Sequence, residues 1–152
     1  MAFEKKHTRY AQLKSATPEL DREAQEALVE VMTIAACVDG MLESDEAHAL
    51  ARQIGATPGF RDLSGEKIAA KIESIVVHIA EEGIESRLKS VGKALGSDPR
   101  TREEAFALAT LFVLWDGEVG DEEQEFLEQL QRELHLSDDQ AATITALVAD
   151  AQ

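Results

Sequence analysis

Hydrophobic residues recur along this chain every three to four positions, which is the spacing of one face of an α-helix. The clearest stripe consists of Ile68, Ile72, Ile75 and Ile79. Nowhere does the alternation of apolar and polar residues that is typical of a half-buried strand persist. Short breaks separate the helical stretches, and short connections place consecutive helices side by side. The pattern therefore predicts an all-α, single-domain bundle of about seven helices.

Several helix starts are marked by residues that cap the first turn. Thr17-Pro18 and Asp98-Pro99 each place a side-chain oxygen directly before a proline, which is favoured at the first helical position. Ser64 is expected to cap the helix that carries the isoleucine stripe. Ser137 and Gln140 have the spacing of a capping box, in which each side chain bonds the backbone of the other residue.

Other boundaries are marked by glycine or by acidic residues. Gly83 and Gly96 are expected to end helices, and Gly40 is expected to adopt the left-handed conformation that commonly follows a helix. Ser44 and Asp121 are expected to be the N-caps of the helices that follow two acidic breaks.

The first part of the chain differs from the rest in charge and periodicity. Residues 1–16 are locally basic and have only weak helical spacing, so they predict a basic N-terminal tail or a short docked helix. Residues 17–152 carry the strong helical pattern and are expected to form the helical domain.

The whole chain is strongly acidic, with a formal net charge of −15 from 30 acidic and 15 basic residues. A surface of this sign repels the phosphates of nucleic acid and anionic lipid. The expected partner is therefore a protein with a basic face, although the charge could also serve solubility alone. The sequence does not indicate an oligomeric state.

Targeting signals and disulfides are not indicated. Cys37 is the single cysteine, so no internal disulfide can form, and its place on an apolar face predicts a buried, inert thiol. The N-terminal residues lack the apolar region of a signal peptide, and no run is long enough to span a membrane. We expect a soluble, cytoplasmic protein that does not insert into membranes.

Two acidic breaks share one sequence frame, Asp-Gly-x-(apolar)-x-x-x-Glu. One runs from Asp39 to Glu46 and the other from Asp116 to Glu123, an offset of 77 positions (116 − 39). Each break joins two predicted helices, so the frame predicts an internal pseudo-repeat of helical hairpins. If the hairpins pack symmetrically, the two acidic corners face each other.

The frame matches part of an EF-hand calcium loop. In that loop an Asp or Asn and a Gly take the fifth and sixth positions, and a Glu takes the twelfth. The first and third positions fall on Phe112 and Leu114 in one copy, and on Ala35 and Cys37 in the other. Because these side chains offer no hard oxygen, neither copy alone can complete a calcium cage.

Pooling both corners predicts a site for a divalent cation, with Asp39, Glu46, Asp116 and Glu123 as ligands. Ligands that are all oxygen favour calcium, magnesium or manganese over zinc. A second interpretation needs no metal, because Asp-Gly forms turns readily and a carboxylate in the first turn is stabilised by the helix dipole. The sequence leaves both interpretations open.

The doubled motif on helical hairpins resembles the TerB-like family of tellurite-resistance proteins, from about Pro18 to the end of the chain. The resemblance implies a bundle of about seven helices with internal pseudo-symmetry. It also implies an acidic site that holds divalent metal, and a role in stress-response complexes near the bacterial membrane. Related domains occur attached to co-chaperones. Only Asp39, Glu46, Asp116 and Glu123 fall on the family motif, and Met41 stands where the second copy has Glu118.

No catalytic pattern stands out in the sequence. The Ser-x-x-Lys strings at Ser64 and Ser86 lack the accompanying motifs of serine-lysine enzymes, and the histidines have no zinc-site spacing. We therefore predict a non-enzymatic, metal-binding interaction module that acts in stress response. The alternative is a metal-independent helical adaptor for protein–protein interactions, resembling a co-chaperone.

Overall fold

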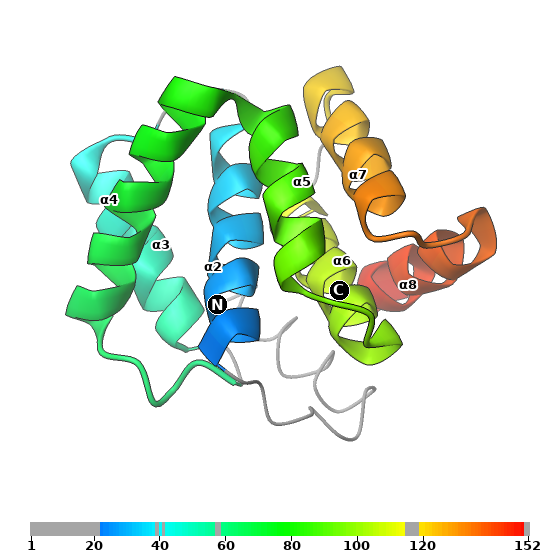
Figure 1. Cartoon of the computed structure of the whole chain (residues 1–152), viewed down its shortest axis with the longest axis horizontal. Helices are drawn as coiled ribbons and strands as arrows, with labels where there is room; N and C mark the ends of the chain where they lie inside the picture. Colours follow the sequence, from blue (N-terminus) through cyan, green and yellow to red (C-terminus); the bar gives the residue numbers. More distant parts are fainter. Residues whose placement is uncertain (1–21, 39, 41, 57–58, 115–118, 151–152) are drawn as a thin grey trace.

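The computed structural model describes residues 22–38, 40, 42–56, 59–114 and 119–150. This part of the chain contains helices and no strands, which confirms the predicted all-α class. Seven helices are labelled in Figure 1 within the described ranges: α2 (Arg22–Cys37), α3 (Ser44–Gly55), α4 (Gly65–Glu82), α5 (Ile84–Ala94), α6 (Pro99–Leu114), α7 (Asp121–Glu133) and α8 (Asp138–Asp150).

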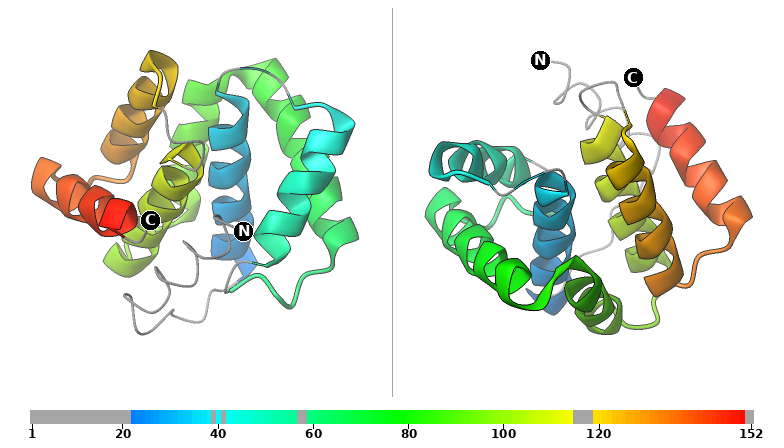
Figure 2. Two further views of the ribbon diagram at one scale, coloured as in Figure 1. Left: turned by 180° about the vertical axis from the view of Figure 1, so that it is seen from behind. Right: turned by 90° about the horizontal axis from the view of Figure 1, so that it is seen from above.

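Helices α2 and α6 pack against each other at the centre of the bundle. Helix α4 contacts α2 and α3, whereas α7 and α8 contact α6. Figure 2 shows the result from two further sides, with α3 and α4 at one end and α7 and α8 at the other. Helix α5 contacts α2, α4 and α7, so it connects the two ends.

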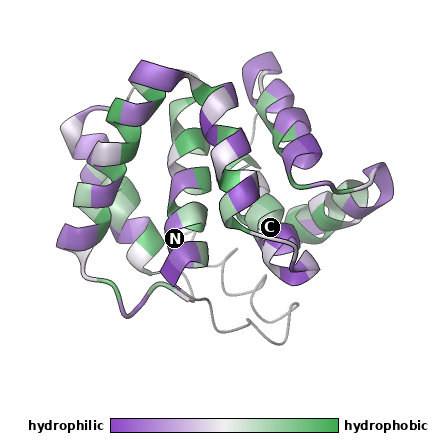
Figure 3. Ribbon diagram, in the orientation of Figure 1, coloured by the Kyte–Doolittle hydropathy of each residue, from purple (hydrophilic) through white to green (hydrophobic). Residues whose placement is uncertain are grey.

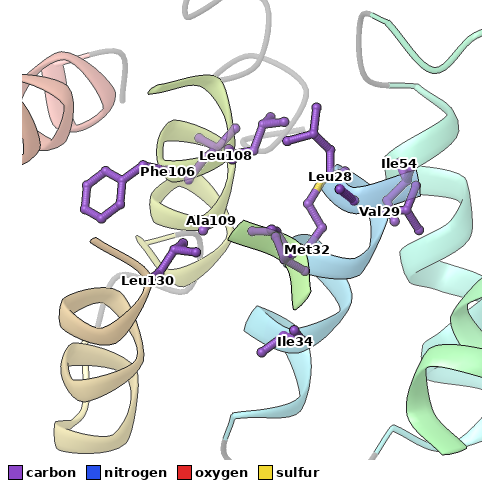
Figure 4. Close-up of a cluster of buried hydrophobic side chains, with 14 of the residues drawn as sticks. Leu28, Val29, Met32, Ile34, Ile54, Phe106, Leu108, Ala109 and Leu130 are labelled. Atoms are coloured by element: carbon purple, nitrogen blue, oxygen red, sulfur yellow. The ribbon is translucent and has the colours of Figure 1, made fainter. Parts of the chain in front are cut away.

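The two central helices are buried on most of their surface because their sequences are apolar almost all round. Figure 4 shows Leu28, Val29 and Met32 of α2 facing the interior, with Leu108 and Ala109 contributed by α6. The outer helices mix polar and apolar residues along their length, as the colours of Figure 3 show, and α7 is the most hydrophilic of them. Burial of apolar faces therefore accounts for the arrangement: α4, α5, α7 and α8 pack on α2 or α6, and α3 packs on α4.

A buried ion pair joins α2 to α5. Arg87 donates from Nε to Oε2 of Glu30 at 2.6 Å and from Nη2 to Oε1 at 2.9 Å, which is a two-bond, fork-like geometry. The side chains of Arg87 and Glu30 are only 18% and 10% exposed. The pairing offsets the cost of placing a carboxylate on an otherwise apolar stretch of α2.

Three of the predicted helix starts, at Ser64, Asp98 and Ser137, are confirmed. Ser64 Oγ accepts a hydrogen bond from the Lys67 amide at 3.2 Å, and Asp98 Oδ1 accepts from the Arg100 amide at 3.0 Å. The Ser137 capping box is also present: the Ser137 amide donates to Gln140 at 2.9 Å, and the Gln140 amide donates to Ser137 Oγ at 3.1 Å. The expected start at Thr17-Pro18 and the basic segment 1–16 lie outside the described residues.

Two predicted N-caps are wrong by one residue. Helix α3 has Glu43 as its N-cap, so Ser44 is its first helical residue. Helix α7 has Gly120 as its N-cap, so Asp121 is likewise already inside the helix. In both helices the glutamate in the third helical position accepts a hydrogen bond from the N-cap amide.

Of the glycine predictions, Gly83 and Gly96 are confirmed as breaks with positive φ, at 86° and 69°. The left-handed cap expected at Gly40 is wrong, because its φ is 159°, close to extended backbone. The Gly40 amide still donates to the Cys37 carbonyl at 3.1 Å, so the helix ends where the sequence indicated.

A full pseudo-repeat of helical hairpins is not established by the packing. Helix α3 makes its main contacts with α4, whereas α7 contacts α5 and α6. The corner residues differ too: Leu42 packs against the core, but its counterpart Val119 is 40% exposed. Within the described part of the chain, no helix is both long and apolar enough to cross a lipid bilayer.

A cavity between the two acidic corners

A cavity of about 410 Å³ lies where the C-terminal ends of α2 and α6 meet the helices that follow each acidic break. Its lining combines an apolar wall with two carboxylates and one amide. The lining residues are Ala35, Ala36, Leu42, Glu46, Ala49, Leu50, Gln53, Phe112, Val113 and Glu123. The cavity thus draws side chains from both copies of the repeated frame.

The lining contains three pairs of positions that correspond in the repeat. Ala35 corresponds to Phe112, Ala36 to Val113, and Glu46 to Glu123, each separated by the same 77 positions as the motif. Such pairing is what two related hairpins would produce if they met at equivalent surfaces. The likeness is local, since the outer packing of α3 and α7 differs.

A related correspondence lies in the buried part of the two central helices. Thr33 donates from Oγ1 to the Val29 carbonyl at 2.8 Å, and Thr110 donates in the same way to the Phe106 carbonyl at 2.8 Å. Both threonines are completely buried, and each hydroxyl is satisfied within its own helix. These equivalent threonines were not identified from the acidic motif, although their spacing of 77 positions would have revealed them.

Each cavity glutamate is oriented by its own helix. Glu46 Oε1 accepts a hydrogen bond from the Glu43 amide at 3.0 Å. Glu123 Oε1 accepts one from the Gly120 amide at 3.1 Å. Both bonds use Oε1, so the second oxygen of each carboxylate is not engaged by the cap. These hydrogen bonds hold the two side chains in place at the cavity, in the first-turn positions where the second interpretation placed them.

The described part of the structure includes two of the four predicted metal ligands. Glu46 and Glu123 line the same cavity, although 77 positions (123 − 46) separate them in sequence. Asp39 and Asp116 lie outside the described residues. Within the described ranges, no group of three or more His, Cys, Asp or Glu side chains is arranged to hold a metal ion.

The oxygen ligands among the described residues suit magnesium or manganese better than calcium. Magnesium is commonly bound through one or two carboxylates and keeps several waters, whereas calcium takes six to eight oxygen ligands. Glu46 and Glu123 supply two carboxylates, and the Gln53 side chain at the same cavity carries an amide oxygen. Manganese shares the preference for oxygen ligands. A calcium site would require further ligands, such as Asp39 and Asp116.

The other polar residues singled out in the sequence have local roles. His48 is exposed, and its Nδ1 lies 2.8 Å from the Ser44 carbonyl of its own helix. Cys37 is buried, as predicted. Neither residue contributes to the cavity lining.

Comparison of the chain with protein-family models, with curated proteins and with solved structures finds no match.

Proposed function

We propose that this chain is a non-enzymatic helical module that binds a divalent cation between its two acidic corners. Glu46 and Glu123 are the proposed ligands among the described residues, and Asp39 and Asp116 complete the proposed set. The single observation that carries the proposal is that Glu46 and Glu123, from separate copies of one motif, line the same cavity.

The electrostatics of the corner support this assignment. Two carboxylates at one cavity repel each other, and a shared cation would remove that repulsion while using their uncapped oxygens. Each glutamate lies in the first turn of its helix, where the helix dipole favours a negative charge. The bound ion would link α3 to α7, two helices that have different packing partners.

The first prediction concerns metal affinity. We expect magnesium or manganese to bind with one-site stoichiometry, and Glu46→Gln or Glu123→Gln to weaken that binding by about tenfold or more. Glutamine keeps the size of the side chain and an oxygen for the cap, so the fold should persist. Isothermal titration calorimetry with magnesium, manganese and calcium measures the effect.

Glu66→Gln is the matched control, because Glu66 is also an exposed first-turn glutamate but lies on α4, away from the cavity. It should leave the affinity unchanged. Equal weakening by all three variants would point to general charge screening, and the cavity would then not be the metal site.

A metal-independent adaptor is the second candidate, and the apolar wall of the cavity favours it. Seven of the ten lining residues are Ala, Leu, Val or Phe, and the two carboxylates are already used as caps. Such a surface suits an apolar side chain flanked by a basic residue of a partner protein. Absence of metal binding together with retained partner binding would select this alternative.

The cellular setting proposed for the module follows from the resemblance to the TerB-like family. It is a role in stress-response complexes of the tellurite-resistance type, including complexes associated with a membrane through other components. The acidic surface, with its net charge of −15, suits a partner with a basic face.

A further inference from the structure

A second cavity, of about 540 Å³, lies between α5, the start of α6 and the turn that joins α7 to α8. It is separate from the acidic cavity and shares no lining residue with it. Its polar lining is mainly cationic. The lining residues are Lys89, Gly92, Lys93, Gly96, Ser97, Arg102, Glu133 and His135.

The charge of this cavity opposes that of the molecule. The chain has twice as many acidic as basic residues, 30 against 15. In the cavity lining, however, Lys89, Lys93 and Arg102 face a single carboxylate, that of Glu133. Three of the fifteen Lys and Arg residues therefore converge on one concave site.

The backbone brings these groups together by close packing. A Cβ atom built on Gly92 would lie 2.8 Å from the Glu133 carbonyl oxygen, so α5 approaches the end of α7 at a distance that only glycine allows. Immediately after that contact, His135 has a positive φ of 57°, which turns the chain toward α8. Lys89 and Lys93 flank Gly92 on α5 and so border the same site as His135.

The cationic side chains are oriented but not fully neutralised. Arg102 donates from Nε to the Gly96 carbonyl at 2.8 Å, a bond that leaves its terminal nitrogens outside that interaction. Lys89 lies 3.8 Å from Glu85, but both side chains are more than half exposed, so the pairing is weak. The Ser97 hydroxyl adds a neutral donor to the lining.

We propose that this cavity binds a small phosphate-bearing anion. Arginine and lysine are the usual partners of phosphate oxygens, and a volume of this size accommodates a small-molecule ligand. An extended polyanion is disfavoured, because the parts of it outside the cavity would meet a protein of net charge −15. The three cations attract only groups within about 8 Å, the screening length at physiological ionic strength. The site and the charge of the molecule therefore select a compact ligand.

Titration with inorganic pyrophosphate, followed by ¹H–¹⁵N nuclear magnetic resonance, tests the proposal. We expect saturable shifts of the Gly96, Ser97 and His135 resonances in the wild type. Lys93→Gln should weaken the affinity about threefold to tenfold, because one of the three cations is lost. Lys93 is exposed, so unchanged resonances elsewhere will show that the variant remains folded.

Lys71→Gln is the control, since it removes the same charge from a half-exposed lysine that pairs with Glu26 at 3.9 Å. It should leave the pyrophosphate affinity within about twofold of the wild-type value. Shifts that fail to saturate, that occur elsewhere on the surface, or that weaken equally in Lys71→Gln would overturn the proposal.

Discussion

Replacing Arg87 by methionine is expected to lower the free energy of unfolding by about 3 kcal/mol, because it leaves the Glu30 carboxylate buried without its partner. The two hydrogen bonds at 2.6 and 2.9 Å are lost together, and the Glu30 side chain is only 10% exposed, so water cannot fully replace them. Urea unfolding followed by circular dichroism measures the change.

The double variant Glu30→Met/Arg87→Met distinguishes the contribution of the ion pair to stability from that of the packing around it. Because both charges are removed, we expect most of the lost stability to return, to within about 1 kcal/mol of the wild type. Lys89→Met is the matched control, since it breaks an exposed pair on the same helix and should change stability by less than about 0.5 kcal/mol. A loss of less than 1 kcal/mol in Arg87→Met would contradict this account.

The charge of Arg87 does not change between neutral and mildly alkaline pH. Its hydrogen bond to Glu30 raises the pKa of the guanidinium, against the opposing effect of burial, and the nearby Glu30 and Glu82 charges raise it further. A group whose pKa is raised on folding contributes stability at low pH and loses it only as the pH rises through the folded-state pKa. For Arg87 that loss lies in strongly alkaline solution, so the stability difference in Arg87→Met should be unchanged between neutral and mildly alkaline pH.

Replacing Gly92 by alanine is expected to destabilise the protein by about 2 kcal/mol. In an unobstructed helix this change stabilises by up to about 1 kcal/mol, because alanine has the higher helix propensity. Here the added methyl group would lie 2.8 Å from the Glu133 carbonyl oxygen, which is backbone and cannot rotate away. The close contact of α5 with α7 must then open, so the clash outweighs the gain in propensity.

Gly65→Ala is the control for this comparison, since a Cβ at Gly65 meets no atom within 4 Å. Gly65 is also helical, as the first residue of α4, and its substitution should leave stability unchanged or slightly raised. Thermal unfolding of both variants provides the measurement. An equal or greater stability of Gly92→Ala would mean that α5 and α7 do not pack as closely as described.

The helical architecture could be predicted because its determinants are local. The isoleucine stripe of α4 repeats at helical spacing, and Ser64, Asp98 and Ser137 cap helices where short-range chemistry favours them. The caps of α3 and α7 were misplaced by one residue because Glu43 and Gly120 lack the usual capping side chain. In these helices Glu46 and Glu123, in the third helical position, accept a hydrogen bond from the N-cap amide.

The sites were harder to predict because they depend on contacts between distant segments. The motif identified Glu46 and Glu123, but their position at one cavity depends on the packing of α2 against α6. The pairing of Glu30 with Arg87, 57 positions away, has no local signal beyond an acidic residue within an apolar stretch. The cationic cavity likewise combines residues from three segments. In the sequence, its Lys89, Lys93 and Arg102 look like ordinary surface residues.

The most direct test of the central claim is manganese titration of ¹⁵N-labelled protein, because bound manganese broadens the resonances of nearby amides. A single shared ion predicts that amides of α3 near Glu46 and of α7 near Glu123 broaden together, with one midpoint. Glu123→Gln should then weaken the broadening in both helices. Two different midpoints, or a Glu123→Gln effect confined to α7, would contradict a site shared by the two corners.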